Sequence, residues 1–162
     1  HPAMTTADFN TLVDEAADAL YRYALGIVRR EDEAADVVQD AFERLWMNRA
    51  KVQPGKGRSY LFSTAHNRAI DRLRRTRPTD EVLPHHVQSS SDDPHDLQEW
   101  LQRGLNTLPP DQRSAILLRD YEGYSYNDIA ALTGLSLDQV KVYIFRARKA
   151  LRAFIGEIEN LV

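Results

Sequence analysis

The chain contains no cysteine among its 162 residues, and only seven glycines and seven prolines. Without cysteine it has no disulfide framework, no thiolate metal site and no cysteine nucleophile. No apolar run approaches the roughly 20 residues that a membrane helix needs, and the first residues lack the basic and apolar regions of a signal peptide. These absences predict a cytoplasmic protein with no membrane insertion.

The sequence also lacks the common signatures of catalytic and cofactor sites. It contains no glycine-rich phosphate loop and no nucleophile elbow. His66, His85, His86 and His95 are not spaced with carboxylates in the manner of a metal site, so we expect them to be polar surface residues. We therefore predict no catalytic residue, no metal and no cofactor, and an enzyme is the least favoured class of function.

The charge is strongly segregated along the chain, although the net charge is only -3. Residues 8–46 hold ten acidic and four basic residues, whereas residues 51–78 hold eight basic residues and one acidic residue. Residues 80–100 hold six acidic residues and no Lys or Arg, and residues 136–153 hold five basic residues and one acidic residue. Two basic blocks separated by an acidic one provide two candidate surfaces for nucleic acid in a chain of acidic total charge.

The spacing of apolar residues predicts three helices in the first half of the chain. The first covers residues 8–30, the second follows the acidic turn 31–33 and ends near Asn48, and the third covers 59 to about 77. Residues 53–57 contain one proline and two glycines, which cannot continue a helix favourably, and are predicted to form a loop.

A domain boundary is predicted where the helical pattern stops. Residues 78–94 contain three prolines, a run of serines and several acidic residues, which is typical of a flexible linker, with a plain spacer as its simplest role. We therefore expect an all-α protein of two small helical domains, 5–78 and 95–160, joined by an acidic flexible linker at 79–94. In the second domain, leucine spacing predicts a helix that stops at Pro109, and a further helix over 111–121.

The pattern over 125–151 predicts a helix-turn-helix that makes the second domain a four-helix domain. Ser125 stands at an N-cap position, and Gly134 lies in a three-residue turn between two helical segments. Ser136 and Gln139 form a capping box at the start of a longer helix. An αα-hairpin with a solvated basic helix is the alternative, but it does not account for cap, turn, second cap and basic face occurring together.

The longer helix of this motif is predicted to enter the major groove of DNA. One stripe, formed by Val140, Ile144, Ala147 and Leu151, is expected to pack inside the domain. The opposite face combines donors for base edges, cations for phosphates and apolar groups that suit a thymine methyl. The predicted contacts are Gln139, Lys141, Tyr143, Phe145, Arg146 and Lys149.

A second nucleic-acid surface is predicted on the basic helix 59–77 and the loop before it. Its arginines can hold the phosphates of a displaced strand, its tyrosine can stack on an unpaired base, its asparagine can bond a base edge, and the loop at 51–59 could hold a flipped base. A solvated basic helix is the alternative on composition alone. The predicted contacts are Lys56, Arg58, Tyr60, Asn67, Arg72, Arg74 and Arg75.

The second helix presents an acidic face that is suited to docking a basic partner surface. This face consists of Asp36, Gln39, Asp40 and Glu43, which recur at three and four residues. A solvated acidic face is the alternative that composition leaves open.

Five segments together resemble bacterial sigma factors. LPPDQR at 108–113, YNDIA at 126–130 and VKVYIFRARKAL at 140–151 resemble the fourth conserved region of that family. EAADVVQDAF at 33–42 and NRAIDRLRR at 67–75 resemble its second region, in the same order and spacing. With only these two regions and a linker, the chain is identified as a member of the extracytoplasmic-function (ECF, group four) sigma factors of the sigma-70 family.

The resemblance implies a non-enzymatic factor that binds core RNA polymerase and directs promoter-specific transcription initiation. It implies that the acidic face of the second helix binds the polymerase clamp helices, that the 59–77 helix recognises and melts the -10 element, and that the helix-turn-helix reads the -35 element. It also implies a linker that follows the polymerase RNA path, and an anti-sigma factor as a further partner. Tyr60 departs from the family, whose members commonly have tryptophan near this position.

A stand-alone DNA-binding regulator whose N-terminal helices dimerise is the competing function. It accounts for the helix-turn-helix, but it leaves the arginine-rich helix before the linker without a role.

Overall fold

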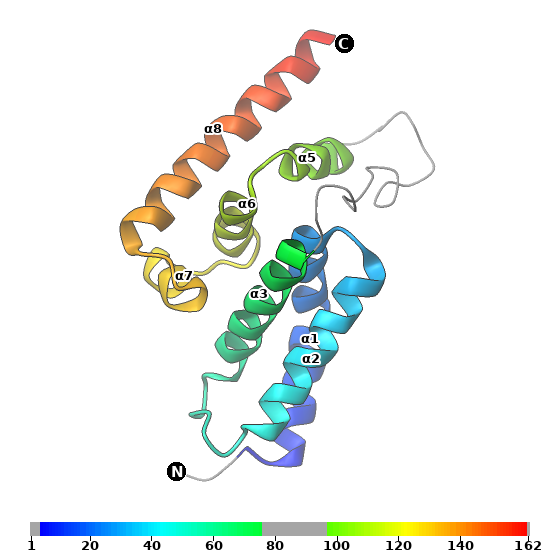
Figure 1. The fold of residues 1–162 in the computed structure, drawn as a ribbon, viewed down its shortest axis with the longest axis vertical. Helices are drawn as coiled ribbons and strands as arrows, with labels where there is room; N and C mark the ends of the chain where they lie inside the picture. The colour runs from blue at the N-terminus through cyan, green and yellow to red at the C-terminus, as the bar shows by residue number, and fades with distance from the viewer. Residues whose placement is uncertain (1–3, 76–96, 162) are drawn as a thin grey trace. The chain divides into compact units, whose positions relative to one another are not determined.

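The computed structural model describes residues 4–75 and 97–161. The chain divides into two compact units, His1–Val82 and Leu83–Val162, and every regular element in the described residues is helical (Figure 1). The all-α fold class predicted from the sequence is therefore confirmed. The predicted linker at 79–94 lies outside the described residues, as do His85, His86 and His95. Within the described residues, no helix is long and apolar enough to cross a membrane.

The N-terminal unit is a bundle of three helices, α1 (Thr6–Val28), α2 (Glu31–Met47) and α3 (Gly57–Arg75), and each packs against the other two. Helix α1 begins at a capping box: the Thr5 hydroxyl accepts a hydrogen bond from the Asp8 N–H (3.0 Å), and the Asp8 carboxylate accepts one from the Thr5 N–H (3.3 Å). This arrangement satisfies two amide groups that the first turn of a helix leaves without partners.

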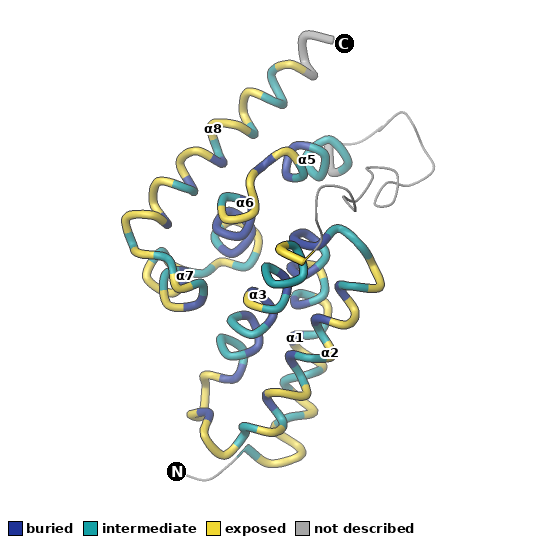
Figure 2. Tube along the Cα trace, in the orientation of Figure 1, coloured by how far each residue is buried: buried dark blue, intermediate teal, exposed yellow. Residues whose placement is uncertain are grey.

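The bundle core is made of large side chains that the apolar periodicity predicts. Leu20, Ile27, Leu45, Leu61 and Phe62 are all fully buried, and Figure 2 shows the buried positions repeating along all three helices. Burying such side chains stabilises the fold by about 1.5–3 kcal/mol each, before the cost of ordering the chain. The packed stripes therefore fix which face of each helix is left for partners.

His66 lies in this core, so the expectation that it is a polar surface residue is wrong. It is 5% exposed, and its Nδ1 lies 2.8 Å from the hydroxyl of Tyr23, which is itself fully buried on α1. A buried polar ring is tolerated where it is hydrogen-bonded. Because 43 residues separate the two partners, the spacing of histidines and carboxylates in the sequence gives no sign of the pairing.

Gly57 is the first residue of α3, although the sequence placed it in the preceding loop. A Cβ atom at this position would lie 2.5 Å from the Leu12 Cδ2 atom of α1, closer than carbon atoms approach. The glycine therefore lets the start of α3 pack against α1, and it does not interrupt the helix.

The C-terminal unit is built around the long helix α8 (Leu137–Leu161). Helices α5 (Leu97–Asn106), α6 (Pro110–Ile116) and α7 (Tyr126–Thr133) each pack against α8. The core residues Leu105, Ile116, Leu118, Ile129 and Ile144 are at most 2% exposed. Over residues 97–161 the unit therefore has its own apolar core and four α-helices, as the sequence predicted.

The helix predicted over 111–121 changes its geometry part-way. It is α-helical to Ile116 and continues as one π-helical turn, η2 (Leu117–Tyr121), in which the Glu122 N–H donates to the Leu117 carbonyl (3.1 Å). Over so short a segment, apolar spacing does not distinguish an α turn from the wider π turn, and the sequence therefore missed it. Single π turns often occur beside functional sites.

Candidate polymerase and DNA interfaces

The helix-turn-helix forms as the sequence predicted. The Ser125 hydroxyl caps α7 by accepting a hydrogen bond from the Asp128 N–H (3.1 Å), and Gly134 ends that helix with a left-handed φ of 81°. Ser136 and Gln139 form the full capping box of α8: the Ser136 N–H donates to the Gln139 side-chain oxygen (2.9 Å), and the Gln139 N–H donates to the Ser136 hydroxyl (3.1 Å). The starts of both helices are thus fixed by local hydrogen bonds.

Helix α8 separates a packed stripe from an open face. Val140, Ile144 and Ala147 are at most 1% exposed. On the other side, Phe145 is 64% and Val142 41% exposed, and their spacing of three residues makes them neighbours on the open face of the helix. Of the six predicted DNA contacts, five are exposed and Tyr143 is half-buried: Gln139, Lys141, Tyr143, Phe145, Arg146 and Lys149.

The basic residues around α3 do not form a single surface. Tyr60, Asn67 and Arg74 are seven residues apart, so they share one strip of the helix. Arg72 lies outside this strip and turns toward α2, where its guanidinium is 3.5 Å from an Asp36 carboxylate oxygen and 3.9 Å from a Glu33 oxygen. The structure therefore leaves Arg74 exposed and places Arg72 in ion pairs with α2. Arg75 is also exposed, and it pairs with Asp71 of its own helix at 3.1 Å.

Tyr60 is held in place by the C-terminal end of α2. Its hydroxyl accepts a hydrogen bond from the Asn48 side-chain nitrogen (3.1 Å) and donates one to the Arg44 carbonyl (3.5 Å). A tyrosine fixed by its hydroxyl in this way costs less entropy to use as a stacking platform than a freely rotating one. Tryptophan has an indole N–H, which can only donate, so it could not make both of these hydrogen bonds.

A cavity of about 550 Å³ lies between the start of α1 and the loop before α3. Arg58, one of the predicted contacts, lines it, and its guanidinium lies 5.1 Å from the centre of the Phe62 ring. Lys56 is exposed in the adjoining loop. The other lining residues are Met4, Thr5, Asp8, Leu12, Val52, Pro54, Gly55 and Gly57.

The four residues predicted to dock a partner share the outer side of α2 but have different neighbours. Asp36 and Asp40 turn toward α3, where Asp40 lies 3.9 Å from the Arg68 guanidinium. Gln39 and Glu43 are exposed at the edge of a groove between α2 and α1. At 100° per residue all four fall within an arc of about 100°, so one partner surface can reach them together.

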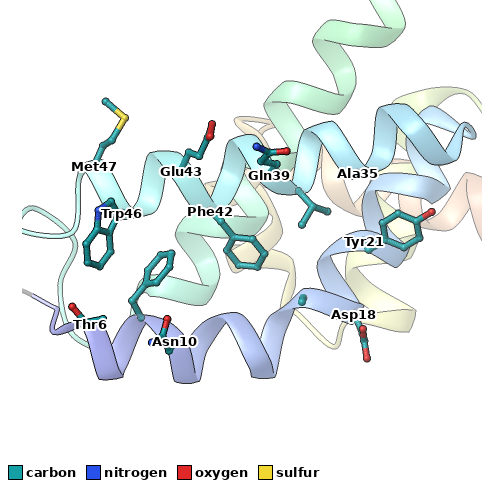
Figure 3. Close-up of a pocket in the computed structure, with 13 residues that line it drawn as sticks. Thr6, Asn10, Asp18, Tyr21, Ala35, Gln39, Phe42, Glu43, Trp46 and Met47 are labelled. Carbon is teal, nitrogen blue, oxygen red and sulfur yellow. The ribbon is translucent and has the colours of Figure 1, made fainter.

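A groove with mostly apolar walls lies between α1 and α2. Its volume is about 1050 Å³, and Figure 3 shows Phe42 and Trp46 projecting into it from α2, with Met47 at one end. The Phe9 ring of α1 packs edge-on against Trp46, with ring centres 5.0 Å apart. The lining residues are Thr6, Phe9, Asn10, Ala17, Asp18, Tyr21, Ala35, Val38, Gln39, Phe42, Glu43, Trp46 and Met47.

The apolar spacing in the sequence does not reveal this groove, because Phe9, Phe42 and Trp46 follow the same helical period as the core residues. In the structure all three are only half-buried. Met47 is 79% exposed beside them, and Arg49 lies over the Trp46 ring, 3.7 Å from its centre. Aromatic side chains with an exposed methionine at one edge are typical of the centre of a protein interface. The sign of the groove in the sequence is that the apolar residues of α2 cover a wider arc than one neighbouring helix can bury.

Two family models match the chain, one over each unit. "Sigma-70 region 2" matches residues 12–79, and "Sigma-70, region 4" matches residues 98–151. The RNA polymerase sigma factor CarQ of Myxococcus xanthus is 30% identical over 159 residues, which cover 93% of this chain and 91% of CarQ. The chain belongs to the ECF sigma factors of the sigma-70 family. The resemblance stated from the sequence is therefore confirmed.

Two relatives that are named as ECF sigma factors agree with this assignment. SigL of Mycobacterium tuberculosis is 30% identical over 166 residues, covering 96% of this chain and 93% of SigL. SigE of Mycolicibacterium smegmatis is 32% identical over 159 residues; the match covers 92% of this chain but only 62% of SigE. This ECF sigma factor thus spans under two thirds of the length of SigE, but nearly the full length of CarQ and SigL.

Two solved structures have the same fold. One is the sigma factor RpoE of Bartonella quintana in complex with the anti-sigma factor NepR (TM-score 0.76, 28% identity, 93% of this chain and 98% of that one). The other is CnrH in complex with the cytosolic domain of CnrY (TM-score 0.71, 27% identity, 94% of this chain and 90% of that one). Both are similar to this ECF sigma factor over both units.

Proposed function

We propose that this sigma factor binds core RNA polymerase through the outer side of α2 together with the α1–α2 groove. The groove supplies the apolar centre that a stable interface needs, and Gln39 and Glu43 supply a polar edge. The acidic residues on the outer side of α2, Asp36, Asp40 and Glu43, then favour a basic partner surface and steer its approach. The exposed apolar groove beside these residues is the observation that carries the proposal.

Promoter DNA is the second proposed partner, and each unit takes one element of it. The exposed face of α8 reads the -35 element, with Lys141, Arg146 and Lys149 suited to phosphates and Gln139 and Phe145 to base edges. The strip of α3 with Tyr60 and Asn67 suits unpaired bases of the -10 element, and exposed Arg74 and Arg75 suit the displaced backbone.

The cavity beside the loop before α3 is suited to hold one unpaired base. Its walls are partly apolar, and it carries one cation, Arg58, and one carboxylate, Asp8. Flipped bases are commonly held by stacking and by hydrogen bonds to their edges. Lys56 in the adjoining loop can contact the phosphate that follows such a base.

The proposed polymerase partner also indicates which protein forms the RNA bonds and where in the cell the sigma factor acts. Bond formation belongs to the polymerase, so the sigma factor contributes no catalytic residue of its own. Its proposed place of action is the cytoplasm, where core polymerase meets promoter DNA. We propose an anti-sigma factor as a further partner, because RpoE and CnrH were solved with partner proteins bound.

A pair of matched variants separates the two proposed surfaces. Met47→Asp and Phe145→Asp each place a charge on an apolar side chain that is already exposed, so both variants should fold normally. Met47→Asp is expected to weaken binding to bacterial core polymerase at least about tenfold, as loss of an interface anchor does, and Phe145→Asp should leave it unchanged. Equal loss of polymerase binding in both variants would refute the assignment of the groove.

A further inference from the structure

Arg148 of the DNA-reading helix is joined to the π-helical turn by a two-pronged ion pair. Its Nε donates to one Asp120 carboxylate oxygen (3.2 Å) and an Nη donates to the other (2.6 Å). The two residues are 28 positions apart, and both side chains are 39% exposed. Fork-to-fork pairing of this kind fixes the relative orientation of two groups, which a single contact does not.

The neighbouring residue of the same turn holds the other helix of the motif. Arg119 donates to the Tyr124 carbonyl (3.0 Å), and its guanidinium lies 4.9 Å from the centre of the Tyr126 ring. Tyr126 is the first residue of α7. Two consecutive residues of η2 therefore contact both helices of the helix-turn-helix.

The π-helical turn is itself firmly anchored. Leu117 and Leu118 are at most 5% exposed, and the Leu118 carbonyl accepts a hydrogen bond from the Tyr124 N–H (3.0 Å). Hydrogen bonding to Asp120 also raises the pKa of Arg148 above its ordinary value. Asp120 thus stands on a fixed part of the domain and faces the helix that reads DNA.

The position of Arg148 on α8 links the pair to DNA reading. Arg148 follows Lys141 by seven residues, or about two helical turns, so both lie on one strip at the edge of the exposed face. Its side chain is nevertheless directed to Asp120. An arginine at this place could contact a phosphate or could hold the helix, and its pairing favours the second role.

We propose that Asp120 and Arg148 are positioning residues that set the rotation of α8 about its own axis, and thereby the bases that its exposed face reads. The inference rests on the proposed function, because it assumes that α8 reads DNA. Recognition groups must be held within about 10–20° of their productive orientation to discriminate between sequences. Loss of the pair should therefore reduce sequence discrimination while leaving the attraction to phosphates intact.

The first test measures helix orientation in the free chain and does not depend on DNA. Ala131 of α7 and Ala153 of α8 are exposed, and the chain has no cysteine, so spin labels attach only at Ala131→Cys and Ala153→Cys. Pulsed EPR should give a narrow distance distribution, which Asp120→Ala broadens or shifts. Asp111→Ala removes the same charge from an exposed site and should change nothing. An unchanged distribution in Asp120→Ala would overturn the proposal.

The second test measures DNA discrimination by the full chain bound to core polymerase. The wild-type complex first selects duplexes from a random library, and success of this selection by itself tests the proposed function. The affinities of the selected duplexes are then compared with those of scrambled duplexes. For Asp120→Ala, Asp120→Asn and Arg148→Lys, the preference for enriched over scrambled duplexes should fall at least about fivefold, the lower end for losing one base contact. The salt dependence of binding should not change.

A direct phosphate contact by Arg148 would give the opposite pattern. Arg148→Ala would then lower the slope of log affinity against log salt by about one, on every duplex alike, and Asp120→Ala would strengthen binding by releasing the arginine. For a positioning pair, the double variant Asp120→Ala/Arg148→Ala instead discriminates no worse than either single variant, because one interaction is lost only once. Melting temperatures of all variants show whether each is folded.

Discussion

Neutralising Asp36 is expected to strengthen the binding of single-stranded DNA by the free sigma factor. The Asp36 carboxylate lies 3.5 Å from the Arg72 guanidinium, and the two side chains are 61% and 31% exposed. For Arg72 to contact a DNA phosphate, this pair has to open first. The ion pair therefore competes with the DNA contact that the sequence predicts for Arg72.

The size of the effect follows from the exposure of the pair. Exposed ion pairs contribute about 0.2–1 kcal/mol, and 1.4 kcal/mol corresponds to a tenfold change in an equilibrium constant. Asp36→Asn removes the nearer of the two carboxylates and leaves Glu33 at 3.9 Å, so it should raise the DNA affinity by about 1.4-fold and by no more than about fivefold. The free energy of unfolding should fall by the same small amount.

Fluorescence anisotropy with a short labelled single strand measures this change. Glu31→Gln is the matched control, because Glu31 is exposed on the same helix and its loss changes the net charge equally. In an Arg72→Ala background, Asp36→Asn should have no more effect than Glu31→Gln does. Equal gains from Asp36→Asn and Glu31→Gln, or a gain that persists without Arg72, would refute the competition between the two contacts.

Three further predictions concern packing, the turn and the reading face. Gly57→Ala should change the free energy of unfolding by less than about 1 kcal/mol in a denaturant titration: the added Cβ would meet the tip of the half-buried Leu12 side chain at 2.5 Å, and the cost of turning that side chain should largely offset the roughly 0.5–1 kcal/mol that alanine gains over glycine in a helix. Gly134→Ala should lower the free energy of unfolding by about 1–2 kcal/mol, because alanine disfavours the left-handed φ at this position. The melting temperature should therefore fall, and an unchanged melting temperature would argue against this turn. Lys141→Ala and Arg146→Ala should each weaken the binding of -35 duplexes with a lower salt slope, while core polymerase binding stays at the wild-type value.

Local patterns predicted the helices and the helix-turn-helix well. Apolar spacing over 17 to 23 residues defined α1, α2 and α3, because so many turns of an amphipathic helix leave little ambiguity. Ser136, Gln139 and Gly134 act within a few residues of one another, and their hydrogen bonds and backbone angle were readable for that reason. The exposed face of α8 followed directly from its packed stripe.

The features that the sequence did not predict depend on contacts between distant residues. The Tyr23–His66 bond and the Asp120–Arg148 pair join residues 43 and 28 positions apart. The α1–α2 groove likewise depends on how far two helices stand apart, which their periodicity does not report. A half-buried Trp46 and a fully buried one give the same pattern in the sequence.

Reconstituted transcription tests the central claim most directly. The purified chain is added to bacterial core RNA polymerase on templates that carry the duplexes enriched by the complex, and core alone and chain alone serve as controls. We expect transcripts with one defined start only when chain, core and promoter are all present, and we expect their loss with Met47→Asp or Phe145→Asp. Tight DNA binding by the chain alone, with no binding to core polymerase and no promoter-dependent transcript, would refute the proposed function.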